Sequence, residues 1–157
     1  MTLNAVFTLN LYADITPGDS LSSGSYRLGF PSTSFTIPAD ADVIITRSLT
    51  TAVGGKIYEP DVNTHDSVVG KDSDGGTVGL NRVYTIALRN ADATNGVTFV
   101  CANMDSGNWS GTLNPVSGLA IAHWPSGVTV GATSTITFTS LAGTPTVDLF
   151  LIGRASA

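Results

Sequence analysis

Charged residues are scarce in this chain, and its basic residues form no cluster. Only 12% of the 157 residues are charged, and the net charge is −5. The seven basic residues are scattered, with no two adjacent, whereas binding to nucleic acid through phosphate neutralisation needs a basic patch. An anionic membrane surface is disfavoured for the same reason. We therefore expect neither nucleic acid nor a membrane as a partner.

Residues that favour helices are equally rare. There is one Glu (Glu59), no Gln, two Lys and two Met, while Gly accounts for 17 residues. Such a chain does not readily build amphipathic helices, and its abundant Thr and Val favour strands. A hydrophobic fraction of 42% can form one core, and the length suits one domain. The composition predicts an all-β protein.

Short alternating apolar segments, separated by turn residues, run along the whole chain. The alternation is clearest in residues 3–11, 80–89 and 147–152, as expected of half-buried strands. About eight to ten short strands in a chain of this length favour an antiparallel β-sandwich or jelly roll, because these folds close or cover their sheet edges. We predict a single such domain over residues 1–157, without a linker or an internal repeat.

Two connections carry more specific expectations. Residues 52–79 are the longest weakly patterned stretch, and they predict a long loop that is mobile or makes contacts. A short strand near residues 56–59 is an alternative within that stretch. Asn95-Gly96 is a turn signal between residues 80–89 and 97–102. The two segments are therefore predicted to pair as a hairpin.

The chain has one cysteine, so an intrachain disulfide cannot form. Cys101 lies in an apolar run and is expected to be a small buried side chain, because a nucleophile would need a histidine and an acid beside it. The first residues have neither the basic nor the apolar region of a signal peptide, and no apolar run approaches the roughly 18 residues of a membrane span. We expect synthesis in a cytoplasm, after which the protein either stays there or leaves by a route that needs no cleaved signal, such as virion assembly and lysis.

One short motif bears on catalysis. Gly18-Asp19-Ser20-Leu21 resembles the serine signature of the GDSL esterases, in which Ser20 would be the nucleophile. That family also needs a late Asp-x-x-His and an α/β fold. Neither His65 nor His123 has an Asp three residues before it. We expect a polar turn at Ser20 and no enzymatic activity.

Carboxylates are concentrated within residues 52–79, where they raise the question of a calcium site. The acidic group comprises Glu59, Asp61, Asp66 and the segment Asp72-Ser73-Asp74-Gly75-Gly76. Calcium takes six to eight oxygen ligands, and the EF-hand pattern is incomplete here, so we expect an exposed acidic loop with calcium as an open alternative. Two histidines and one cysteine are too few for zinc. His123 is expected to be hydrogen-bonded and partly buried, and no cofactor is expected.

Aromatic residues and two-sided apolar strands are the candidates for contacts with other molecules. Trp109 stands among turn residues, where a Trp can stack on a sugar or fill a partner's pocket. The first and last strands carry apolar residues on both faces, which suits strands that are central, covered locally by the same chain, or covered by another subunit. The predicted interface residues are Trp109, Tyr58, Val6, Tyr12, Phe150 and Ile152.

In its small size, acidity and Thr-, Gly- and Ala-rich segments such as 41–46 and 131–137, the chain resembles capsid decoration proteins of tailed bacteriophages. The resemblance implies a structural protein that forms homo-oligomers, with a trimer as the expected state, and packs on the major capsid protein of a virion. The alternative is a carbohydrate-binding or adhesion module that uses Trp109, Tyr58 and Trp124 as stacking platforms. A hydrolase based on Ser20 or on paired carboxylates is the third reading.

Overall fold

The computed structural model describes backbone and side chains for residues 38, 40–51, 55–63, 78–104, 107–116 and 118–156. It describes the backbone alone for the strand residues 6–9, 12–15, 26–29, 33–36, 64–65 and 68–69. All regular secondary structure within these ranges is β-strand. No helix long and apolar enough to cross a bilayer occurs in this part of the chain.

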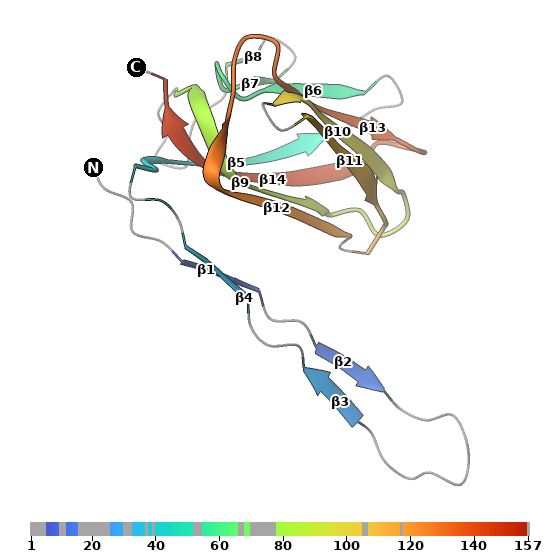
Figure 1. Ribbon diagram of the computed structural model, residues 1–157. Helices are drawn as coiled ribbons and strands as arrows, with labels where there is room; N and C mark the ends of the chain where they lie inside the picture. The colour runs from blue at the N-terminus through green and yellow to red at the C-terminus, as the bar shows by residue number, and fades with distance from the viewer. Residues whose placement is uncertain are drawn as a thin grey trace, which may run out of the picture.

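Two antiparallel sheets pack face to face (Figure 1). The four-stranded sheet contains, in spatial order, β12 (Leu119–Thr129), β9 (Leu80–Asn90), β14 (Thr146–Ala155) and β5 (Val43–Thr50). The six-stranded sheet contains, in spatial order, β11 (Gly107–Leu113), β10 (Val97–Met104), β13 (Thr135–Ser140), β6 (Lys56–Glu59), β7 (Thr64–His65) and β8 (Val68–Val69).

The order of the eight longer strands of these sheets is nested. The first pairs with the last, the second with the seventh, the third with the sixth and the fourth with the fifth: β5 with β14, β6 with β13, β9 with β12, and β10 with β11. This nesting is the strand order of the jelly-roll form of the β-sandwich. The predicted all-β, antiparallel sandwich is confirmed.

The core lies between the sheets and follows the alternation of the strands. Val147, Leu149 and Leu151 of β14 are buried against Ile136 and Phe138 of β13 and their neighbours. β14 lies between β9 and β5, and a central strand is covered on both edges and, at one end, on both faces. On the outer face of β14, Ile152 is buried with Ala41 and Tyr84, whereas Phe150 is half-buried.

The predicted hairpin of β9 and β10 is wrong, because these strands belong to different sheets. The connection between them crosses from one sheet to the other. The fully buried side chain of Asn90 holds this crossing, since its Nδ2 donates to the carbonyl oxygens of Asn95, Leu113 and Asn114. β10 instead pairs with β11 and β13.

The described part of residues 52–79 is mostly sheet rather than loop. The strand considered at residues 56–59 is present as β6, which pairs with β13, and β7 and β8 continue the same sheet. The backbone at Gly79 packs closely against the backbone at Asp61, since a Cβ on Gly79 would lie 1.7 Å from the backbone oxygen of Asp61. Residues 52–54, 66–67 and 70–77 lie outside the described residues.

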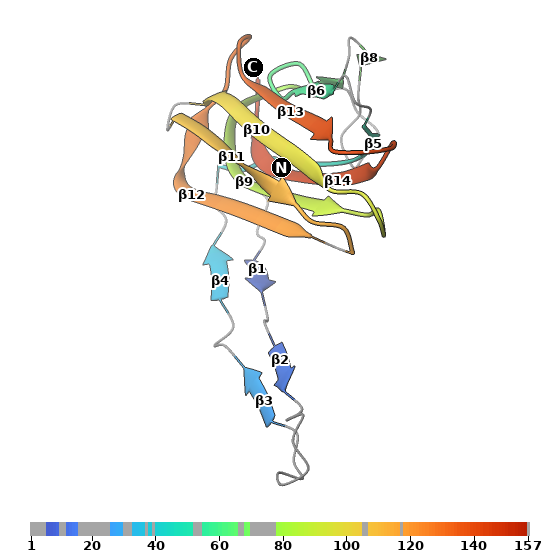
Figure 2. The same cartoon turned by 90° about the vertical axis from the view of Figure 1, so that its right-hand side faces the viewer.

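The first four strands are not part of the sandwich. β1 (Val6–Leu9) pairs with β4 (Thr33–Thr36), and β2 (Tyr12–Ile15) pairs with β3 (Tyr26–Gly29), both antiparallel. Figures 1 and 2 show these two pairs in line, projecting away from the sandwich on the side of the four-stranded sheet. We call the pairs β1–β4 and β2–β3 the arm. The prediction of one sandwich over residues 1–157 is therefore corrected: the sandwich begins at β5.

Candidate functional site

Strand register decides which residues share the outer face of the four-stranded sheet. Directly opposite residues in an antiparallel pair lie on the same face. Asp148 of β14 is opposite both Arg89 of β9 and Ser48 of β5, and Arg89 is opposite Leu119 of β12. These four residues form one row across the sheet. The next row on the same face is Ile121, Ala87, Phe150 and Thr46.

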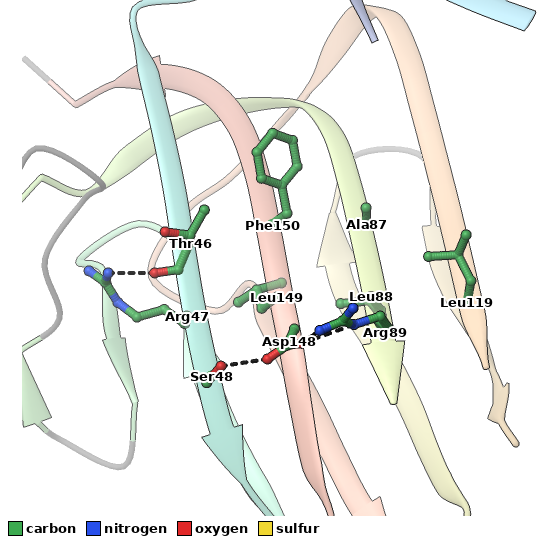
Figure 3. Close-up of a pocket in the computed structure, with 10 residues that line it drawn as sticks. All are labelled: Thr46, Arg47, Ser48, Ala87, Leu88, Arg89, Leu119, Asp148, Leu149 and Phe150. Carbon is green, nitrogen blue, oxygen red and sulfur yellow. Dashed lines mark hydrogen bonds and ion pairs between the residues drawn. The ribbon is translucent and has the colours of Figure 1, made fainter. Parts of the chain in front are cut away.

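The two rows border a shallow groove of about 310 Å³, which we call the outer groove (Figure 3). Phe150 stands near its centre on β14, with Ala87 on one side and Thr46 on the other. The lining consists of Thr46, Arg47, Ser48, Ala87, Leu88, Arg89, Leu119, Asp148, Leu149 and Phe150.

The polar end of the outer groove is an ion pair that neutralises itself. Arg89 Nε donates to Asp148 Oδ2 at 3.0 Å, Arg89 Nη2 donates to the same oxygen, and the Ser48 hydroxyl donates to Asp148 Oδ1. Burial acts to raise the pKa of Asp148, but the hydrogen bonds from Ser48 and Arg89 and the charge of Arg89 outweigh it, so the pKa lies below its usual value. The pair leaves little charge to attract an ionic ligand.

Beyond this row, the outer groove is mainly apolar, with Thr46 and Arg47 at its β5 side. Phe150 and Ala87 are half-buried, and Leu119 is 52% exposed although it is a large hydrophobic residue. Asp148 is the one carboxylate in the lining, and no histidine or cysteine is present there to activate a hydroxyl. A flat apolar strip beside a neutralised polar row suits the docking of a segment with one apolar face.

A second, small apolar cluster fixes the chain where the arm joins the sandwich. Ala41, Tyr84 and Ile152 are buried together, with exposed fractions of 0%, 1% and 2%. Tyr84 donates its hydroxyl to Asp40 Oδ2 at 2.7 Å, and Arg154 Nη1 lies 3.6 Å from the same oxygen. Burial and the neighbouring Asp40 raise the pKa of Tyr84. The expectation that Ile152 meets another subunit is corrected, because the chain itself covers it.

Trp109 lies in the edge strand β11 and is partly buried. Its ring centroid is 4.7 Å from that of Phe99 and 6.4 Å from that of Trp124, both in edge-to-face arrangements. It is opposite the buried Cys101 in the β10–β11 register, so it faces the core. Trp109 and Trp124 close the edge of the sandwich between β11 and β12, and they do not form an exposed stacking platform.

Tyr58 is also unavailable to a ligand or a neighbour, because it is fully buried. Its hydroxyl donates to Asn63 Oδ1 at 2.7 Å, and Arg47 Nη2 donates to the same oxygen at 3.1 Å. Burial raises the pKa of Tyr58, and the charge of Arg47 only partly opposes this. The predicted contact of Tyr58 with other molecules is therefore corrected to a contact within the core.

Cys101 and His123 have the burial and hydrogen bonding that the sequence predicted. Cys101 is buried, and burial raises the pKa of its thiol to about 12, so it is not a nucleophile in the folded domain. His123 is half-buried, and its Nδ1 lies 3.0 Å from Thr85 Oγ1 in a hydrogen bond. Both predictions are confirmed.

The structure leaves other candidates untested. Ser20, Asp66, Asp72 and Asp74 lie outside the described residues, as do the side chains of Val6, Tyr12 and His65. Glu59 and Asp61 are described, and no cluster of three or more metal-ligating side chains occurs in the ranges with described side chains. The calcium question at the acidic segment therefore stays a prediction.

The outer groove was not predicted from the sequence, apart from Phe150. The alternation of β14 does place Asp148 and Phe150 on one face, but only strand pairing brings Arg89, Ser48 and Leu119 beside them. No protein-family model, curated protein or solved structure matches the chain. The function has to be inferred from the fold, the arm and the outer groove.

Proposed function

We propose that this protein is a non-enzymatic structural component of a virion, which forms homo-oligomers and packs on a capsid as a decoration or stabilising protein. The observation that carries the proposal is a jelly-roll sandwich with a two-stranded arm that projects from it (Figures 1 and 2). Jelly rolls recur in viral capsid proteins and in lectins, and a projecting arm is a device for reaching a neighbouring subunit.

The surface chemistry supports an assembly role over a lectin role. The aromatic residues considered for sugar stacking, Tyr58, Trp109 and Trp124, pack within the sandwich or along its closed edge. The outer groove combines the apolar side chains of Ala87, Leu119 and Phe150 with the Arg89–Asp148 ion pair, a mixture that is typical of surfaces that meet protein. Many weak, neutral contacts repeated over a lattice give strong overall attachment through avidity.

Purified particles provide the direct test. Virions from a lysate of the organism that encodes the chain are banded by density and probed for it by quantitative mass spectrometry. We expect the chain in the particle band at a fixed ratio to the major capsid protein, and recombinant protein should rebind particles from which it has been stripped. Absence from the particles, with all of the chain in the soluble fraction, would contradict the proposal.

Oligomeric state is the second measurement. Light scattering after size exclusion should report an oligomer, with a trimer as the proposed state, over a series of protein concentrations. Binding to a glycan array, in a protein that remains monomeric and fails to rebind particles, would favour the adhesion alternative instead.

A further inference from the structure

We propose that two copies of this chain pair edge to edge through β12, antiparallel about a two-fold axis, with Leu119 of each copy opposite Ile121 of the other. The contact goes beyond the proposed function and does not depend on it, because it requires only a second copy of the chain. In the proposed oligomer it is an additional contact, which joins the copies in twos.

The hydrogen bonds between β9 and β12 show which backbone groups of β12 are open. The Asn90 N–H donates to the Gly118 carbonyl, and these residues are opposite each other when the β9–β12 register is continued by one residue. Because bonded and non-bonded pairs alternate along an antiparallel ladder, Ala120 also bonds to β9, whereas the N–H and C=O groups of Leu119 and Ile121 point away from it. β12 is the terminal strand of its sheet, and in the part of the chain that the structure describes these groups have no backbone partner.

The bonds between β9 and β14 give the same answer. The Ala91 N–H donates to the Thr146 carbonyl, so the next bonded pair along that ladder is Arg89 with Asp148. The backbone of a residue in a central strand bonds to one neighbouring strand only, so the backbone of Arg89 does not bond to Leu119, which is opposite it in β12. Figure 3 shows Leu119 on β12 at the margin of the outer face.

The edge of β12 lacks the charge that protects the opposite edge of the same sheet. Exposed edge strands are commonly guarded by charged side chains or by groups that cover the backbone. At the β5 edge, Arg47 Nη1 donates to the Thr46 carbonyl at 2.8 Å and also supplies a charge. β12 has no Asp, Glu, Lys or Arg, and Pro125 interrupts it further along. The open stretch of β12 is therefore short, uncharged and available for strand pairing.

A second copy of β12 supplies partners for these groups. A two-fold axis at Ala120 sets Leu119 of each copy opposite Ile121 of the other, and each of these pairs exchanges two backbone hydrogen bonds. The two aliphatic side chains of each pair then meet on the outer face of the extended sheet. Leu119, which is 52% exposed, and Ile121, which is half-buried, thereby cover each other.

The same register keeps the charged groups of the two copies apart. On the outer face, the row that contains Arg89 and Leu119 of one copy continues into the row that contains Ile121 and Ala87 of the other. Each charged row therefore meets an apolar row, and the two Arg89 side chains are not neighbours. The axis uses the open edge of β12 in both copies, so the pair is closed and does not grow into a fibre.

Amide hydrogen exchange tests the pairing in the unsubstituted protein. The N–H groups of Leu119 and Ile121 are open in a single copy, whereas that of Ala120 is bonded to β9. Exchange at Leu119 and Ile121 should slow at least tenfold as the protein concentration is raised, while Ala120 should be protected at every concentration. Thr112, which is exposed on the other edge strand β11, is the control and should not change. Fast exchange at Leu119 and Ile121 at the highest concentration would overturn the proposal.

A disulfide trap tests the register. Opposite residues of a non-bonded antiparallel pair have Cα atoms about 4.5 Å apart, which a disulfide can span, and the axis makes the two copies of Ala120 such a pair. Ala120→Cys should therefore give a covalent dimer under mild oxidation, since the native Cys101 is buried. Leu141→Cys, at a residue 62% exposed, should give at least tenfold less. Dimers through Ile121→Cys but not through Ala120→Cys would show a different register and overturn the proposal.

Charge substitutions test the facing side chains without a cross-link. Leu119→Lys and Ile121→Glu should each weaken self-association at least tenfold, because each sets a charge opposite an aliphatic side chain. An equimolar mixture of the two variants should regain association, since the introduced lysine of one copy then faces the introduced glutamate of the other. Leu141→Lys is the matched control and should change association less than twofold. A mixture that associates no better than either variant alone would count against the pairing.

Failure of the edge pairing and failure of the proposed function give different results. A chain that is present in particles at a fixed ratio, but shows neither the Ala120→Cys dimer nor the regained association of the mixture, overturns the edge pairing and leaves the proposed function standing. A chain that is absent from particles but shows both effects overturns only the proposed function.

Discussion

Replacement of Asn90 by alanine should lower the free energy of unfolding of the sandwich by about 3 kcal/mol. The side chain is fully buried where β9 leaves the four-stranded sheet. Its Nδ2 lies 2.8 Å from the Asn95 carbonyl oxygen and 3.2 Å from those of Leu113 and Asn114, and its Oδ1 accepts the N–H of Asp92 at 3.0 Å. It thus joins the β9–β10 crossing to the end of β11.

The magnitude follows from counting these bonds. An amide nitrogen has two hydrogens, so the three carbonyls share two donated bonds, and one further bond is accepted. Each net hydrogen bond contributes about 1 kcal/mol, and a buried acceptor left without a partner costs about 1–3 kcal/mol. Leu113 is 1% exposed, so water cannot easily replace the lost donor. Alanine is therefore expected to cost about 3 kcal/mol, or about 10 °C in Tm for a domain of this size.

Urea denaturation followed by Trp fluorescence, at one fixed protein concentration, measures the change. Asn81→Ala is the matched control, since Asn81 is exposed on the same strand, and it should change stability by less than about 0.5 kcal/mol. Asn90→Asp should be worse than alanine at pH 7, because a buried carboxylate would face the three carbonyls. Since burial raises the pKa of that carboxyl in the folded state, stability should recover as pH falls from neutral toward about 4 and should gain no more below it. A loss below about 1 kcal/mol for Asn90→Ala would refute the reasoning.

Four further outcomes are expected. Cys101, whose pKa burial raises to about 12, should react with a thiol reagent at pH 8 at least a hundredfold more slowly in the native protein than in urea. Asp148→Asn should lower the free energy of unfolding by at most about 1 kcal/mol at pH 7. Because folding lowers the pKa of Asp148, its contribution to stability is present above the unfolded pKa of 3.8 and is lost as pH falls through the folded pKa. The stability difference between Asp148→Asn and the unsubstituted protein should therefore vanish in acid titrations. Gly79→Ala should cost more than about 2 kcal/mol by urea denaturation, because its Cβ would meet backbone, whereas Gly131→Ala, with nothing within 4 Å, should be nearly neutral. Val116→Asn should raise Tm by a few degrees, since Val116 has a φ of 62° and is 76% exposed, and an unchanged or lower Tm would count against strain there.

The strands and several side-chain environments could be predicted because they depend on local pattern. Alternation predicted the long strand near residues 80–89, and an apolar run indicated a buried Cys101. The strand at residues 56–59 was only an alternative to the predicted loop. His123 at an alternating position was correctly expected to be hydrogen-bonded and partly buried. Each of these expectations needs only the neighbours of a residue along the chain.

The pairing of strands could not be predicted in the same way. Asn95-Gly96 has the residues of a tight hairpin, yet the chain crosses to the other sheet there, and Asn90 ties this crossing to the end of β11, a segment about 20 residues away. Tyr84 is another example. The β9–β14 register shifts at this residue, which makes it the unpaired residue of a bulge and turns it from the core face toward Asp40.

The sequence by itself determined the class of the protein: scarce helix formers, abundant Thr and Val, and period-two alternation leave a helix-free sandwich as the way to bury its apolar residues. Only the tertiary structure decided which strands are neighbours, that Tyr58 and Ile152 are covered by their own chain, and that Phe150, Leu119 and Asp148 meet on one open face. The physical reason is that local preference acts over a few residues, whereas register and burial depend on segments up to about a hundred residues apart, such as Ser48 and Asp148.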